Sequence, residues 1–128
     1  MKKITEKERL VGKLELFEDK DRHFFLAKPH GMINPSLLKE DLERARTFAN
    51  QVNAPWTYIT NTENVNIVNP LNLIYLKEVK KIKNLKRIVV YAPHFIHRVL
   101  LRMARFIVQP DIILTQKHEF EKLIATVK

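Results

Sequence analysis

The sequence predicts an α/β protein in which helices cover a mixed sheet, and three observations lead to this class. Short runs rich in β-branched and aromatic residues alternate with longer segments whose apolar residues recur every three or four positions. Asn-Pro pairs stand where two of the longer segments begin, as expected for helix starts. Strand-helix-strand alternation favours parallel pairing. We therefore expect a single-domain, mostly parallel sheet of about five strands with four helices.

The first expected elements are two short strands at residues 12–18 and 23–28, joined by a charged turn. Apolar and charged residues alternate in the first run, and the second is more continuously apolar. Together they predict a hairpin that contributes one antiparallel strand. Residues 29–31 are expected to end the hairpin, because Gly31 is free to adopt a positive φ.

The first helix is expected to begin at Asn34-Pro35 and to stop at Asn53-Ala54-Pro55. Its apolar residues recur at spacings of four and three, which predicts one buried stripe. That stripe consists of Leu38, Leu42, Ala45, Ala49 and Val52.

Three further strand-helix units complete the expected order. The strands are expected at residues 56–60, 87–92 and 111–114, and the helices begin at Asn69, Pro93 and Thr115. The helix that begins at Pro93 is expected to bury Ile96, Val99, Leu100, Met103 and Phe106 or Ile107. The last helix is expected to pack through Phe120, Leu123, Ile124 and Val127.

Composition excludes several kinds of protein. The 128 residues suit one domain, with residues 1–9 interpreted as a charged N-terminal extension. The absence of cysteine excludes disulfides, thiolate nucleophiles and cysteine-bound zinc. No apolar run approaches the roughly 20 residues that cross a bilayer. We therefore expect a cytoplasmic protein without a transmembrane segment.

The net charge of +9 is concentrated in one part of the sequence. Residues 77–105 contain nine basic side chains and one acidic side chain, Glu78. A local field of this kind favours an anionic partner. A solvated face that only keeps the protein soluble is the alternative.

Within this segment, one face of the expected third helix carries a basic stripe. Arginine suits phosphate because its planar side chain donates two hydrogen bonds at once. An apolar residue among arginines suits a helix at a membrane interface, and an ordinary exposed helix is the alternative. The candidate residues for partner or anion binding are His94, Arg98, Leu101, Arg102 and Arg105.

A second candidate site is the polar loop after the strand at residues 56–60. Ligands of open parallel sheets bind beyond the carboxyl ends of strands, although asparagines also serve simply as turn formers. The candidate residues of this ligand loop are Thr60, Asn61, Thr62, Asn64 and Asn66.

No catalytic or metal-binding constellation is expected. His94 and His97 are three residues apart on one helix, but no carboxylate stands at a helical spacing beside them. Ser36 lies in the first turn of a helix, outside any nucleophile motif. The two glycines are too few and too far apart for a phosphate-binding loop. The sequence therefore predicts a protein that is not an enzyme, with no metal and no cofactor.

The segment from Asn84 to Phe120 carries a family resemblance. The run Leu85-Lys86-Arg87-Ile88-Val89-Val90-Tyr91 is followed by a helix, a short strand at Asp111-Ile112-Ile113-Leu114 and an acidic start to the last helix. With the leading hairpin, this order resembles the STAS domain (sulfate transporter and anti-sigma-factor antagonist). It is most similar to the SpoIIAA-like branch, which is also similar to the lipid-binding SEC14 fold.

The resemblance implies a SpoIIAA-like fold and a regulatory module. The family's switch is a phosphorylated serine or threonine in an Asp-Ser-Gly-like turn before the second helix. The corresponding turn here, Ile67-Val68-Asn69-Pro70, has no hydroxyl group and no glycine. Thr60 and Thr62 lie at the beginning of the same loop, and the sequence does not tell whether either is phosphorylated.

We therefore expect a non-catalytic binding or regulatory module that contacts a protein partner, an anionic lipid surface or a small ligand. The alternative is a nucleic-acid-binding protein that uses the basic segment 77–105. The aromatic residues nearby are expected to face the core, which favours a lipid or protein partner over nucleic acid. The sequence leaves open whether two copies form a homodimer.

Overall fold

The computed structural model describes residues 2–9, 12–32, 35–67, 77–93, 99, 102, 112–115 and 117–125. Its strands are β1 (Lys2–Arg9), β2 (Gly12–Asp19), β3 (Phe24–Met32), β4 (Trp56–Asn61), β5 (Val65–Ile67), β6 (Leu85–Tyr91) and β7 (Ile112–Thr115). Its helices are α1 (Pro35–Val52) and α4 (Lys117–Ala125), and residues 77–80 are also helical.

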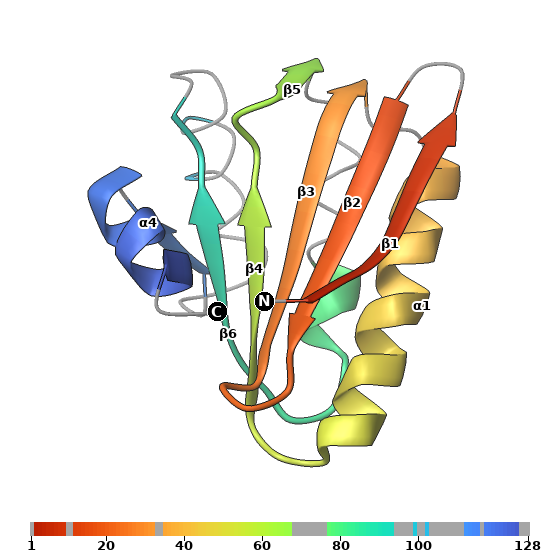
Figure 1. Cartoon of the computed structure of the whole chain (residues 1–128), viewed down its shortest axis with the longest axis vertical. Helices are drawn as coiled ribbons and strands as arrows, with labels where there is room; N and C mark the ends of the chain where they lie inside the picture. Colours follow the sequence, from red (N-terminus) through yellow and green to blue (C-terminus); the bar gives the residue numbers. More distant parts are fainter. Residues whose placement is uncertain are drawn as a thin grey trace.

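The strands form one seven-stranded sheet in the order β1-β2-β3-β4-β6-β7, with β5 paired to β3 (Figure 1). The pairs β1/β2 and β2/β3 are antiparallel, and the other four pairs are parallel. The predicted α/β class and the hairpin of β2 and β3 are confirmed. The strand number was underestimated, and a second antiparallel pairing makes the sheet more mixed than predicted. Four helices were expected, and parts of the second and third expected helices lie outside the described residues.

Strand β1 corrects the interpretation of residues 1–9 as an extension. β1 pairs with residues 12–18 of β2, from Lys2 opposite Glu18 to Arg9 opposite Gly12. Lys2 lies opposite Glu18, and Nζ of Lys3 lies 3.3 Å from the Glu15 carboxylate; opposite charges across two strands stabilise such a pairing. Charged side chains also protect an edge strand from pairing with further chains.

Strand β3 continues through Pro29 to Met32, although the sequence predicted an end at Pro29. The parallel ladder to β4 stops at Ala27, and the backbone N–H of Gly31 donates to the carbonyl of Asn64 beside β5 (2.8 Å). Pro29 lies between these two positions, so its missing N–H faces a gap between ladders and forfeits no hydrogen bond. Gly31 has a φ of 71°, as its predicted freedom allows.

Helix α1 has the predicted bounds and covers one face of the sheet, behind the strands in Figure 1. Its buried stripe differs from the prediction in phase, since Leu38, Leu42 and Val52 are only partly buried. The buried residues are Leu37, Asp41, Ala45, Phe48 and Ala49. The buried hydroxyl of Tyr58 in β4 donates to the carboxylate of Asp41 (2.6 Å), which turns this polar position toward the core.

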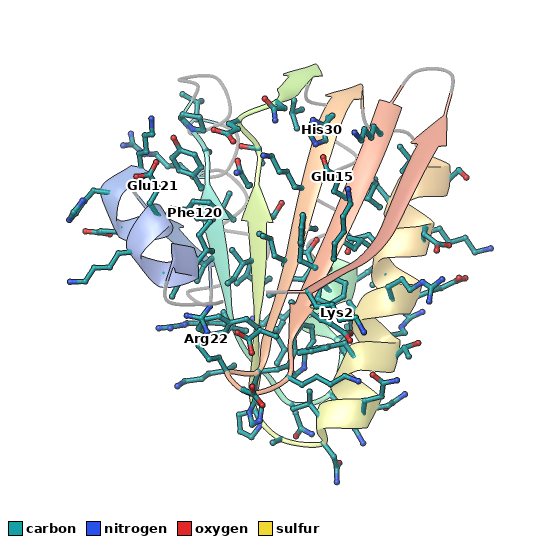
Figure 2. All side chains as sticks on the ribbon, viewed as in Figure 1. Lys2, Glu15, Arg22, His30, Phe120 and Glu121 are labelled. Carbon is teal, nitrogen blue, oxygen red and sulfur yellow. The ribbon has the colours of Figure 1, made fainter. Side chains whose placement is uncertain are left out.

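Helix α4 packs on the opposite face, as its predicted apolar residues require. Phe120 is buried and stacks on Tyr91 of β6 with ring centroids 4.8 Å apart (Figure 2). Leu123 and Ile124 pack against the same cluster, and Val127 lies outside the described residues. The guanidinium of Arg22, in the turn between β2 and β3, donates to the carbonyl of Leu123 (2.8 Å). This bond ties the end of α4 to the sheet.

Candidate functional site

The predicted ligand loop lies at the carboxyl end of β4, beside the carboxyl end of β6. We call residues 60–64 the carboxyl-end loop, which leads from the end of β4 into β5 (Figure 1). Thr60 and Asn61 are buried, whereas Asn64 is exposed. Asn66 belongs to β5. The structure therefore brings the five predicted loop residues into one short stretch at the expected edge of the sheet.

Hydrogen bonds within this loop fix its shape. The backbone N–H and the hydroxyl of Thr62 both donate to the carbonyl of Tyr91 in β6 (2.9 and 3.0 Å). The side-chain oxygen of Asn61 accepts from the backbone N–H of Glu63 (3.0 Å), and its side-chain nitrogen donates to the Glu63 carboxylate (3.2 Å). The N–H of Val65 closes the turn on the carbonyl of Thr62 (3.1 Å). The predicted turn-forming role of asparagine is thus realised at Asn61.

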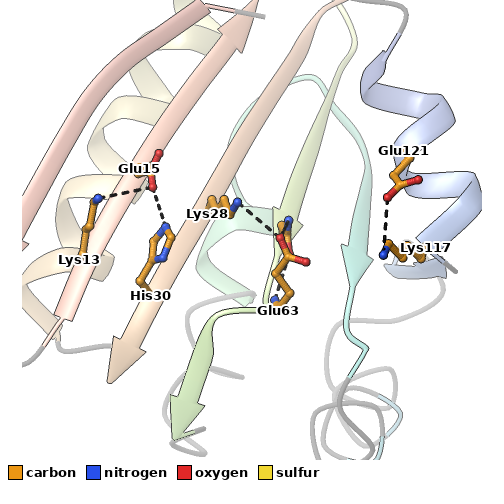
Figure 3. A network of polar contacts seen from close by, with 8 residues as sticks. Lys13, Glu15, Lys28, His30, Glu63, Lys117 and Glu121 are labelled. Carbon is orange, nitrogen blue, oxygen red and sulfur yellow. Dashed lines mark hydrogen bonds and ion pairs between the residues drawn. The ribbon is translucent and has the colours of Figure 1, made fainter.

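Two contacts join the loop to β3. The ammonium group of Lys28 lies 3.4 Å from the Glu63 carboxylate (Figure 3). The carbonyl of Asn64 accepts from the backbone N–H of Gly31. The carboxyl-end loop is therefore held by β3 on one side and by β6 on the other.

A charged cluster that the sequence did not reveal lies next to this loop on β2 and β3. The Glu15 carboxylate lies 2.7 Å from Nε2 of His30 and 3.7 Å from Nζ of Lys13 (Figure 3). It also lies 3.3 Å from Nζ of Lys3. Burial alone raises the pKa of Glu15, but the hydrogen bond and charge of Lys3 and the charge of His30 outweigh it and lower the pKa. Alternation along the predicted strand at residues 12–18 could have placed Lys13 and Glu15 on one face, whereas His30 and Lys3 lie outside the predicted strands.

The predicted basic stripe is only partly within the described residues. Arg102 is helical and exposed, as predicted. Val99 is 40% exposed, so its assignment to the core was wrong. Residues three apart share a helix face, and Val99 therefore lies on the side of Arg102 rather than opposite it. The stripe residues outside the described part are His94, Arg98, Leu101 and Arg105.

The described residues meet neither the requirements of a metal site nor those of a membrane-spanning helix. Among the described residues, no three His, Asp or Glu side chains form a group that could hold a metal ion. Over the same part of the chain, no helix is long and apolar enough to cross a membrane.

Comparison with solved structures decides the fold family. The anti-sigma factor antagonist SpoIIAA, in its unphosphorylated form, matches with a TM-score of 0.61 and 13% sequence identity, over 90% of this chain and 98% of that chain. The fold is STAS-like. The predicted resemblance is confirmed at this level. Neither a family model nor a curated protein matches the sequence of this STAS-like chain.

Proposed function

We propose that this STAS-like chain is a non-catalytic regulatory module that binds a protein partner through the carboxyl-end loop. The observation that carries the proposal is the hydrogen bonding that holds the loop: Thr62 donates to the carbonyl of Tyr91 in β6, and the carbonyl of Asn64 accepts from Gly31 in β3. A loop fixed before its partner arrives loses little conformational entropy on binding. The likeness to an anti-sigma factor antagonist, a protein named for its action on another protein, supports the same function.

The bonding of the loop also argues for a protein partner over a small ligand or substrate. Small-ligand sites present a few polar groups that converge into a hollow. Here the hydroxyl of Thr62 is engaged by Tyr91, and both polar atoms of the Asn61 side chain are engaged by Glu63. A surface whose polar groups are already bonded to one another can be recognised through its shape, and this suits the broad contact area of another protein.

Two described residues of the expected third helix provide a second argument for a binding function. Arg102 and Val99 are both exposed there, and a mixed basic and apolar face suits an anionic partner. We keep the basic stripe as a second proposed contact, in addition to the carboxyl-end loop. A cytoplasmic location is part of the proposal, since a chain without cysteine suits a reducing compartment.

Affinity capture with a matched pair of variants tests this function. Asn64→Arg places a long charged side chain on the exposed carboxyl-end loop, and Asn50→Arg makes the same change on the exposed face of α1. Proteins retained from a lysate of the source organism are quantified by mass spectrometry, and the main candidate is then purified and titrated. We expect the wild type and Asn50→Arg to bind equally and Asn64→Arg to lose at least about tenfold in affinity. Equal binding by all three proteins, or no retained protein, contradicts the proposal.

A further inference from the structure

A second polar surface lies at the other end of the sheet, where β4 and β6 begin. Residues 77–80 form a helical turn on the α1 side of the sheet, and the short loop that follows reaches the end where β6 starts at Leu85 (Figure 1). Glu78 is the only acidic residue in the sequence between positions 77 and 87. Four exposed lysines define what we call the lysine surface: Lys77, Lys81, Lys83 and Lys86.

The backbone beneath these lysines is anchored by a buried tryptophan. The indole Nε1–H of Trp56 donates to the carbonyl of Lys83 (2.8 Å), and the backbone N–H of Trp56 donates to the carbonyl of Asn84 (3.0 Å). Trp56 is 1% exposed, so both donor groups are buried. The carbonyls of Lys83 and Asn84 thus point toward Trp56, and this holds the loop backbone against the core.

A register shift between β4 and β6 places the side chain of Lys86 in solvent. Trp56 pairs with Leu85, but the next residue, Thr57, pairs with Arg87, so Lys86 is an extra residue on β6. Strict alternation from Ile88 would direct Lys86 into the core on the α1 side. The bulge leaves Leu85 packed against that core and Lys86 exposed. Bulges that redirect one side chain are common beside functional sites.

The positive charge of the surface is little reduced by its neighbours. Lys81 lies 3.2 Å from the Glu78 carboxylate, in a pair whose side chains are 63% and 40% exposed. Such solvated pairs contribute little free energy and exchange partners easily. Nζ of Lys83 donates to the side-chain oxygen of Asn53 (3.3 Å), which is an uncharged partner.

We propose that the lysine surface binds the anionic headgroups of a phospholipid membrane. The argument is charge complementarity, since each lysine near an anionic leaflet contributes about 1 kcal/mol. Nucleic-acid binding normally adds aromatic side chains on which bases stack, and the described aromatic residue that is bonded to this loop, Trp56, is buried. The four side chains carry no apolar anchor, so contact is electrostatic and reversible. The opposite end of the sheet stays available for the protein partner.

Liposome flotation tests this proposal with a double variant and a control of equal charge. Lys83→Gln with Lys86→Gln removes two charges from the lysine surface, and Lys39→Gln with Arg46→Gln removes two exposed charges from α1. The vesicles are pure phosphatidylcholine, or contain about one third phosphatidylserine. We expect the wild type to bind only the acidic vesicles, the lysine double variant to bind about 30-fold more weakly, and the control to change by less than about threefold. Circular dichroism checks that both variants fold.

Three results overturn the proposal. The first is an absence of binding to acidic vesicles, or equal binding to neutral ones. The second is an equal loss in both double variants, which shows a response to net charge alone. The third is tighter binding to duplex DNA, lost with the same lysines and steeply dependent on salt, which assigns the surface to nucleic acid. Asn64→Arg should leave flotation unchanged, so a failure here is distinguishable from a failure of the proposed protein contact.

Discussion

The two ends of the sheet carry loops that are fixed in opposite ways. At the carboxyl end, side chains such as Asn61 and Thr62 hold the loop, and their polar groups are engaged in doing so. At the amino end, a buried tryptophan holds the backbone of Lys83 and Asn84, and the lysine side chains extend into solvent. The carboxyl-end loop therefore has a defined shape. The amino end has a fixed backbone that carries exposed, charged lysine side chains.

This difference bears on the kind of partner each end suits. A defined shape discriminates between partners through complementarity. Mobile charge attracts any surface of opposite sign and is weakened by salt. One STAS-like domain could therefore recognise a protein specifically at one end while the other end rests on a membrane.

The largest expected effect comes from removing the anchor of the amino end. Trp56→Ala deletes a fully buried indole, which leaves the carbonyl of Lys83 without its side-chain donor and opens a cavity beneath the loop. We expect the free energy of unfolding to fall by about 3–5 kcal/mol, measured by urea denaturation. Trp56→Phe keeps most of the volume and should cost about 1–2 kcal/mol through the lost hydrogen bond. A loss below about 1 kcal/mol for Trp56→Ala would show that the loop is not anchored there.

A smaller effect is expected from the corresponding change at the carboxyl end. Thr62→Val keeps the shape of the side chain but removes its hydrogen bond to the carbonyl of Tyr91. We expect a loss of about 1 kcal/mol in unfolding free energy and weaker binding of the protein partner. Thr47→Val is the control, because the Thr47 hydroxyl also donates to a backbone carbonyl, that of Glu43, but on the exposed face of α1. Equal losses in both variants would remove the distinction between the loop and an ordinary helix surface.

Acid should weaken the amino end through Asp19. Burial raises the pKa of Asp19, but hydrogen bonds from the backbone and side chain of Arg22 outweigh it and lower the pKa below its ordinary value of 3.8. A carboxyl with a lowered pKa stabilises the fold when ionised, fully so above that ordinary value, and this stability is lost as the pH falls through the lower folded value. We expect the wild type to lose stability below about pH 4, measured by urea denaturation at each pH. Asp19→Asn should show a shallower loss, and an identical profile would contradict the assignment.

The smallest effect on stability is expected at the surface itself. Lys81→Gln breaks the exposed pair with Glu78 and should change the unfolding free energy by less than about 0.5 kcal/mol. Binding to acidic vesicles should nevertheless fall about fivefold. A loss of stability with unchanged vesicle binding would show that Lys81 stabilises the fold and does not contact the membrane.

The elements that follow from local pattern were predictable, and those that depend on a neighbour were not. The Asn-Pro start of α1 and the alternation in β2 gave correct elements because both signals lie within a few residues. β1 has a charged sequence whose strand conformation depends on pairing with β2. Asp41 is buried because Tyr58, on another element, supplies a hydrogen bond. Periodicity alone cannot report such a partner.

The candidate sites divide in the same way. The position of the carboxyl-end loop was predictable, because the strand at residues 56–60 and the polar run after it are both local signals; its role as a binding site stays a prediction. The engagement of Thr62 by Tyr91 was not, because the two residues are distant in sequence and meet only across the β4/β6 ladder. The exposure of Lys86 depends on a one-residue register shift, which leaves no mark in composition or periodicity.

Amide hydrogen exchange followed by NMR tests most directly whether both loops are fixed in the free protein. Three N–H groups are informative. The backbone N–H of Thr62 donates to β6, the backbone N–H of Gly31 donates to the carboxyl-end loop, and the indole N–H of Trp56 donates to the loop before β6. We expect all three to exchange at least about a hundredfold more slowly than in an unfolded chain, without any partner present. Exchange of the Thr62 and Gly31 amides at unfolded-chain rates, with β4 still protected, would contradict a preformed carboxyl-end loop.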